Sequence, residues 1–211
     1  MALRLTAPSE DILGANYKIT KIVASDYNPN IDSTITVTVT VKDVYDDPVE
    51  NESVQVTCNI GKFTKLNGST ISDTQSVTGN TDSNGQFTLT YSCTEWGLIT
   101  FSANNKSTQI KVKGWKQIWS AESNKFVAYR DETHGRLIID GLVRSAIPIS
   151  FGQYGTGTPL SGIAPIKSTF DLINDSAIII KIGADGKLSF KSNTGVAQSN
   201  VTVHGQVEWG I

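Results

Sequence analysis

The sequence predicts an all-β protein built from two β-sandwich domains. Apolar residues alternate strictly with threonine over residues 34–41, which is the pattern of a half-buried antiparallel strand. Residues 176–191 predict a hairpin, because Asp185 and Gly186 form a strong turn signal between two strand-like runs. Both patterns have the period of a strand, so the predicted class is all-β.

The pattern of the chain changes near Gly114, and no helical period of useful length follows it. A chain of 211 residues with 38% hydrophobic content has enough apolar side chains for one or two modest cores. We therefore expect three parts: an N-terminal segment over 1–16, a first domain over 17–114 and a second domain over 115–211.

The first domain carries its turn and strand signals in a characteristic order. They are the alternating strand 34–41, the turn Asp46-Asp47-Pro48-Val49, the valines Val54 and Val56, the segment Thr81-Asp82-Ser83-Asn84-Gly85, the strand 86–91 and the segment from Gly97 to Ala103. This order resembles the bacterial Ig-like domain of the invasin and intimin type. It departs from that pattern at Asp47, where the family usually has a glycine before the proline.

The resemblance covers about residues 17–114 and implies an Ig-like β-sandwich. Domains of this family serve as spacers or display modules on an extracellular or virion surface, and almost never as enzymes. Similarity of fold does not supply a ligand, so the first domain alone identifies no partner.

Charge and hydropathy exclude two classes of partner. A net charge of -2 and a pI of about 5.7 give no basic field for nucleic acid or for an anionic membrane. The first residues lack the apolar core of a secretory signal, and no run is long enough to cross a bilayer. We expect no nucleic-acid partner and no membrane insertion, and either a fragment of a longer secreted protein or release within a virus particle.

Cys58 and Cys93 are the two cysteines of the chain. Each continues the inward-facing alternation of its strand, so both thiols are expected in the core of the first domain. A disulfide between them and two buried free thiols both fit this placement. Two cysteines without suitable neighbours do not predict a zinc site.

The second domain also reads as short strands. The expected strands are 115–119, 125–130, 136–143, 146–151, 168–172, the hairpin 176–191 and the closing strand 201–209. The arrangement resembles the C-terminal β-domain of phage tail-fibre and receptor-binding proteins. The positions that carry this resemblance are Pro165, Ile182, Asp185, Gly186, Leu188 and Trp209. It implies a small jelly-roll-like β-sandwich that assembles as a homotrimer.

One strand of the hairpin is apolar on both faces, which suggests an oligomer interface. The residues concerned are Ile178, Ile179, Ile180 and Ile182. A strand at the centre of a monomeric sandwich is the alternative, because such a strand is also covered on both faces.

The Gly-rich loop after residue 151 is the candidate receptor-binding site. Its members Tyr154, Gly155 and Thr156 combine an aromatic ring with a long loop, and long loops on rigid sandwiches often carry recognition. The alternative is that the Tyr154 ring packs onto its own domain.

His134 lies beside two carboxylates, and acidic residues also gather around Asp43 and Asp82. Metal ligation is one interpretation, but the spacing lacks a calcium-loop pattern, and Asp and Asn are common turn residues. We expect turns at these places, no metal site, no cofactor and no catalytic residues, since no nucleophile motif is present.

The sequence therefore favours a structural virion protein, a phage tail-fibre or receptor-binding component that contacts other virion proteins and a host cell-surface glycan or protein. The alternative is a fragment of a prokaryotic cell-surface adhesin with an Ig-like stalk, at an extracellular location. A second alternative is a capsid or head-fibre decoration protein without a receptor. None of these is an enzyme.

Overall fold

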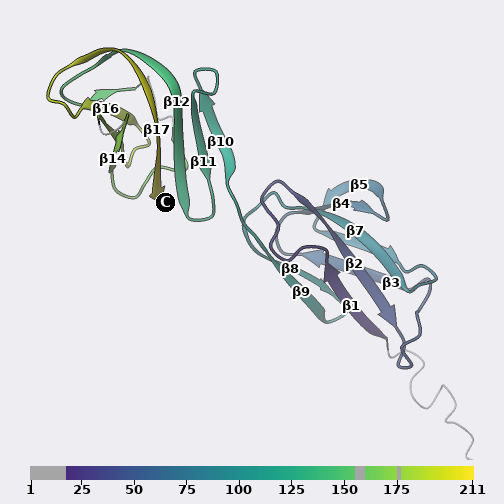
Figure 1. Cartoon of the computed structure of the whole chain (residues 1–211). Coiled ribbons are helices and arrows are strands. Elements are labelled where there is room, and N and C mark those ends of the chain that lie inside the picture. The colour runs from purple at the N-terminus through teal and green to yellow at the C-terminus, as the bar shows by residue number, and fades with distance from the viewer. Residues whose placement is uncertain (1–17, 155–159, 175–176) are drawn as a thin grey trace, which may run out of the picture. The chain divides into compact units, whose positions relative to one another are not determined.

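The computed structural model describes residues 18–154, 160–174 and 177–211 (Figure 1). In these ranges the chain forms antiparallel sheets and no helix, so the all-β prediction is confirmed. The chain divides into two compact units, Met1–Lys113 and Gly114–Ile211. Nowhere in the described ranges is there a helix of the length and apolar character needed to cross a membrane.

The first unit is an Ig-like sandwich of two sheets, β1-β2-β7-β4-β5 and β6-β3-β8-β9, around one core. The strands β1-β2-β7-β4 occupy the positions of strands A, B, E and D of an immunoglobulin domain, and β3-β8-β9 those of C, F and G. The bounds are β1 Ile19–Ala24, β2 Thr34–Lys42, β3 Ser53–Cys58, β4 Lys62–Leu66, β5 Ser69–Thr74, β6 Ser76–Asn80, β7 Gln86–Ser92, β8 Gly97–Ala103 and β9 Lys106–Val112.

The alternation over 34–41 has the structural result that the sequence predicts. Val37, Val39 and Val41 of β2 are fully buried, whereas the threonines between them face outward. In the neighbouring strand β7, Leu89 lies opposite Val37 and Phe87 opposite Val39, so the same face of both strands meets the core. The pleat thus leaves the outer face of this sheet to hydroxyl side chains.

Aspartates shape the turns of the first unit. The carboxylate of Asp82 accepts hydrogen bonds from the backbone N–H groups of Asn84 (2.8 Å) and Gln86 (3.0 Å). These bonds stabilise the ionised form and lower the pKa of Asp82. Asp43 accepts in the same way from the N–H groups of Tyr45 and Asp47. The turn roles predicted for both acidic clusters are confirmed.

In the part of the second unit that the structure describes, eight strands form two four-stranded sheets, β10-β11-β12-β17 and β13-β16-β15-β14, which enclose a second core. Two four-stranded antiparallel sheets form the small β-sandwich expected here, and consecutive strands such as β10-β11-β12 and β14-β15-β16 are neighbours within one sheet. The bounds are β10 Lys116–Ala121, β11 Phe126–Arg130, β12 His134–Ile147, β13 Gly152–Gln153, β14 Thr169–Ile173, β15 Ile178–Ile182, β16 Leu188–Ser192 and β17 Gln198–Gly210.

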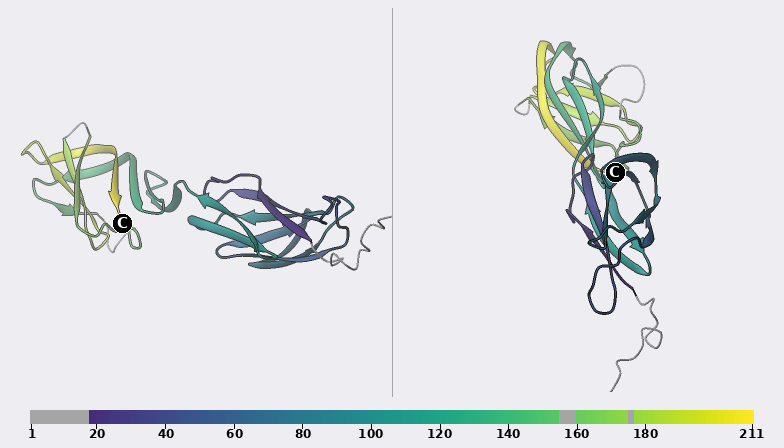
Figure 2. Two further views of the ribbon diagram at one scale, coloured as in Figure 1. Left: turned by 90° about the horizontal axis from the view of Figure 1, so that it is seen from below. Right: turned by 90° about the vertical axis from the view of Figure 1, so that its right-hand side faces the viewer.

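The prediction of separate strands over 136–143 and 146–151 is wrong, because β12 runs through as one strand of 14 residues beside β17 (Figure 2). Their pairing shifts register between Ile139 and Leu142, where Gly141 has a φ of 70°. A bulge of this kind bends a strand without ending it. β12 and β17 therefore pair on both sides of the bulge, over most of their length.

Trp209 of β17 fixes the closing strand in the core. Its indole N–H donates to the carbonyl of Ile163 at 2.6 Å, and the side chain is 5% exposed. Opposite it on β12 is Gly135, whose missing side chain makes room for the indole ring. A Cβ atom at this position would overlap the ring carbons.

We expect Gly135→Ala to lower the free energy of unfolding by about 1–3 kcal/mol, because the ring or the strand must move to admit a methyl group. Gly210→Ala is the matched control on the same sheet, since a Cβ there meets nothing within 4 Å. Urea denaturation of both variants measures the difference. Equal stability of the two variants would contradict this account of the packing.

Candidate functional site

Tyr154 of the predicted receptor loop packs onto its own domain. Its ring stacks on Phe126 with centroids 4.7 Å apart, and it meets Phe190 edge-on at 6.3 Å. The hydroxyl donates to Glu122 at 3.3 Å, and burial raises the pKa of Tyr154. This agrees with the alternative interpretation of Tyr154, in which the ring packs onto its own domain and covers part of the core. Gly155 and Thr156 lie outside the described residues.

The isoleucines of the predicted oligomer interface divide between the two faces of β15. Ile178, Ile180 and Ile182 are fully buried in the core of the second unit, as the alternative of a central strand required. Ile179 alone of the four is half-buried on the outer face. Of these four isoleucines, Ile179 is therefore the one whose side chain could contact a partner chain.

Cys58 and Cys93 are free thiols, and both are buried in the core of the first unit. Desolvation is the main reason that the pKa of Cys58 rises to about 11, and it also raises the pKa of Cys93. Thiols held in the protonated form are weak nucleophiles and weak metal ligands. Their role is to fill space between the sheets.

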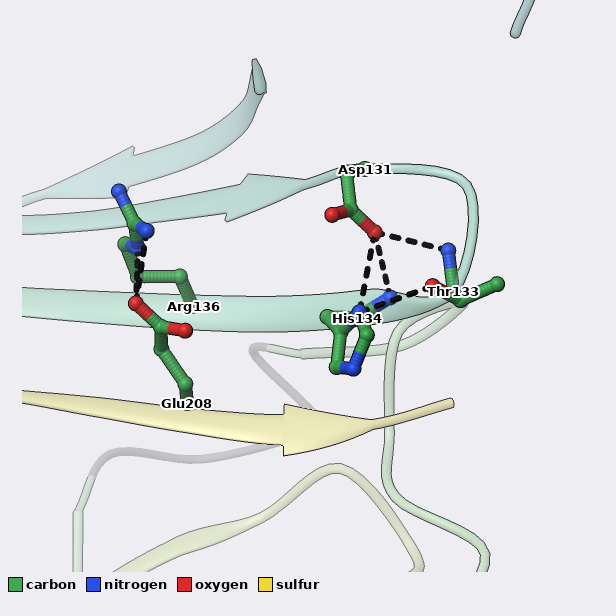
Figure 3. A network of polar contacts seen from close by, with 5 residues as sticks. All are labelled: Asp131, Thr133, His134, Arg136 and Glu208. Atoms are coloured by element: carbon green, nitrogen blue, oxygen red, sulfur yellow. Dashed lines mark hydrogen bonds and ion pairs between the residues drawn. The ribbon is translucent and has the colours of Figure 1, made fainter. Parts of the chain in front are cut away.

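His134 is the first residue of β12 and directly follows the turn at 131–133, where the sequence predicts a turn. The Asp131 carboxylate accepts from the backbone N–H of Thr133 at 2.8 Å and of His134 at 2.6 Å (Figure 3). The His134 ring lies 3.5 Å from the same carboxylate and contacts the Thr133 hydroxyl at 2.8 Å. Among the described residues, no three His, Cys, Asp or Glu side chains gather closely enough to hold a metal ion.

A second polar network lies on the outer face of the β10-β11-β12-β17 sheet. Arg136 of β12 and Glu208 of β17 are directly opposite in the register, and Nε and Nη2 of the guanidinium both contact Oε1 of Glu208 at 2.7 Å (Figure 3). Gln206 donates to the same oxygen at 2.9 Å. None of these three contacts uses Oε2 of Glu208.

Aromatic rings flank this pair. The Arg136 guanidinium lies over the ring of Trp115, 4.0 Å from its centroid, which is a cation–π arrangement. Tyr129 of β11 is opposite Arg136 in the register and therefore on the same face. Both rings are half-buried. We call this set the Arg136 face: Trp115, Tyr129, Arg136, Gln206 and Glu208.

The Arg136 face combines two half-buried rings with an amide and a guanidinium held by an ion pair. Arg136 and Glu208 neutralise each other, so the face offers hydrogen bonds and stacking rather than a net charge. An ion pair this exposed adds little stability, and its effect is to hold the guanidinium in one orientation. Such a surface suits contact with a protein or with the face of a sugar ring.

The Arg136 face was not predicted from the sequence. Arg136 and Glu208 are 72 positions apart, and nothing local in the sequence indicates that they pair. The alternation of β17 does place Gln206 and Glu208 on its polar face, and that was the available signal.

No protein-family model matches the chain. No curated protein matches it either. Among solved structures it is similar to the Yersinia pseudotuberculosis adhesin InvE, with 14% identity over 94% of this chain and 61% of InvE and a TM-score of 0.38. The chain thus spans about three fifths of the length of InvE.

The D0-D1 domain of intimin is 15% identical over 92% of this chain and 99% of its own, with a TM-score of 0.33. Domains 4 and 5 of the S-layer protein SbsC are 19% identical over 46% of this chain and 52% of theirs, with a TM-score of 0.29. At these scores a functional assignment depends on the chain's own residues.

We expect Tyr154→Ala to destabilise the second unit by about 1–3 kcal/mol, because it removes a half-buried ring packed against two others. Tyr154→Phe keeps the ring and loses one long hydrogen bond, so its stability should lie within about 1 kcal/mol of the unsubstituted chain. Urea unfolding compares the two variants. If both were as stable as the parent chain, the ring would not be part of the core.

The raised thiol pKa predicts a loss of stability at alkaline pH. The Cys58 thiol has a pKa of about 11 in the folded chain, and about 8.5 is expected in the unfolded chain. Between these values the folded chain binds more protons, so the free energy of unfolding falls as pH rises. The stabilisation by the protonated Cys58 thiol is fully present at pH values below the pKa of the thiol in the unfolded chain.

Urea unfolding at a series of pH values measures this slope, and Cys58→Ala should make it shallower. Val56→Ala is the control, because it truncates a neighbouring buried side chain without removing a titrating group. An unchanged slope in Cys58→Ala would refute the assignment.

Proposed function

We propose that this chain is a surface-displayed attachment protein, in which the first unit is a spacer and the second unit binds the partner through the Arg136 face. The observation that carries the proposal is the contrast between the outer faces of the two units. Fixed aromatic and guanidinium groups occur on a sheet face of the second unit, whereas the corresponding faces of β2 and β7 carry small polar side chains.

The outer faces of β2 and β7 suit a spacer. Their outward residues are Thr34, Thr36, Thr38 and Thr40 on β2 and Gln86, Thr88, Thr90 and Ser92 on β7. These side chains are well hydrated and offer little area to a partner. A rigid sandwich with such a surface separates a binding unit from its attachment point without competing for the ligand.

The Arg136 face suits recognition. Trp, Tyr and Arg are the residues that most often dominate binding energy at protein interfaces. The guanidinium is already held between Trp115 and Glu208, so little side-chain entropy is lost on binding. Neutrality of the Arg136–Glu208 pair favours a partner recognised by stacking and hydrogen bonds.

This proposal places the protein at a prokaryotic cell surface as an adhesin with an Ig-like stalk. The burial of Ile178, Ile180 and Ile182 within one chain favours it over a trimeric fibre, because those side chains are already covered. The partner would be a cell-surface protein or glycan.

A phage tail-fibre or receptor-binding component is the second candidate, located in the virion, and a capsid or head-fibre decoration protein is a variant of it. Its motif residues Ile182, Asp185, Gly186 and Leu188 do form one tight β15–β16 hairpin. Light scattering separates the candidates: a homotrimer in solution favours the fibre, and a monomer favours the adhesin.

The binding test uses fluorescently labelled full chain on cultured epithelial cells and on intact bacterial cells. We expect saturable binding that Trp115→Ala weakens by about tenfold, the loss of one anchor residue. Tyr45→Ala is the matched control, since Tyr45 is a 69% exposed ring of the first unit. Equal weakening by both substitutions, or no binding to either cell type, would overturn the proposal.

A further inference from the structure

We propose that the second unit has a separate binding site for an acidic sugar, a pyranose that carries a carboxylate, in a hollow on its other sheet. The hollow has a volume of about 460 Å³, within the usual range of ligand sites. Its walls come from β13, β15, β16, the β15–β16 turn and the segment before β14. The lining residues are Phe151, Gln153, Ser168, Lys181, Gly183, Ala184, Asp185, Lys187 and Ser189. We call it the Lys181 hollow.

The strand register builds the floor of the Lys181 hollow. Gln153 lies opposite Ser189, and Ser189 lies opposite Lys181, so an amide, a hydroxyl and an ammonium group follow one another across three strands. Neighbouring strands are about 4.8 Å apart, so groups on adjacent strands can reach different hydroxyls of one sugar ring. Leu188 and Phe190, the neighbours of Ser189 along β16, are buried in the core and anchor this part of the floor.

The charge of the hollow favours an anion. Lys181 and Lys187 line it together with one carboxylate, Asp185, which pairs with Lys187 at 3.4 Å. A third lysine, Lys191, lies against the wall with Nζ 5.9 Å from the centroid of the Phe151 ring. Two lysines and one carboxylate line the hollow, and Lys191 lies beside it, so the formal charge of this region is positive although the chain as a whole is acidic.

The Phe151 ring distinguishes a sugar from a simple anion. This ring is 39% exposed and forms an apolar wall beside the lysines. The C–H face of a pyranose can cover such a ring, while its hydroxyls reach the neutral side chains of Gln153, Ser168 and Ser189. Phosphate or sulfate alone would use the lysines and leave the ring and these three groups without a role.

The Lys181 hollow and the Arg136 face belong to opposite sheets of the sandwich, so the inference does not depend on the proposed function. The test titrates the full chain with hyaluronan hexasaccharide, whose glucuronic acid units carry carboxylates, and with chitohexaose, a neutral chain of N-acetylglucosamine. We expect calorimetric binding of hyaluronan that weakens as salt is raised, because the ion pairs are screened. We expect no measurable binding of chitohexaose.

Substitutions then locate the site. Lys181→Gln and Phe151→Ala should each weaken hyaluronan binding by about tenfold. Lys21→Gln, an exposed lysine of the first unit, and Val196→Ala, 66% exposed in the second unit, should leave it unchanged. Thermal unfolding of each variant confirms that the fold is retained.

Three outcomes would overturn the inference: equal binding of both saccharides, equal weakening by Lys21→Gln, or no binding of hyaluronan at low salt. Trp115→Ala should not affect hyaluronan binding. If hyaluronan does not bind but cell binding is intact, the Lys181 hollow is refuted and the Arg136 face is supported. If hyaluronan binds but the chain does not bind cells, the Arg136 face is refuted and the Lys181 hollow is supported.

Discussion

The pleat of the β-strand is the constraint on which both units depend. Because successive side chains point to opposite faces, each strand in a two-sheet sandwich must direct every second side chain into the core. Val37, Val39 and Val41 meet this demand in the first unit, and Ile178, Ile180 and Ile182 meet it in the second. With the inner faces committed to apolar packing, any difference in function between the units has to appear on the outer faces and in the turns.

This constraint explains which parts of the structure the sequence could predict. Elements that depend on neighbours in the chain were predicted correctly. They are the strand over 34–41, the hairpin at Asp185 and Gly186, and the turns at Asp43 and Asp82. The isoleucine strand was harder, because an apolar residue at every position hides the alternation. Only the register shows that Ile179 lies on the outer face and its neighbours in the core.

The candidate site could not be predicted from the local sequence, for a physical reason. Arg136 meets Glu208 because the first part of β12 pairs with the end of the last strand, 72 positions further along the chain. The rest of β12 continues through the bulge at Gly141 and pairs with the first part of the same strand. The sequence shows that a glycine is present, but whether it ends a strand or bends it depends on the strand alongside. Tyr154 is similar, since its ring packs against Phe126 and Phe190, which come from two other strands.

The two outer faces of the second unit differ in charge, and this difference decides how they would act together. On the Arg136 face the cation is matched by Glu208, so its attraction for a partner is short-ranged and depends on shape. In the Lys181 hollow the lysines outnumber Asp185, so an acidic glycan is attracted before contact. Sites on opposite sheets do not compete for space. A partner surface that presents an acidic glycan beside a protein epitope would therefore be held at two points, and the second contact would form at the high effective concentration that the first one provides.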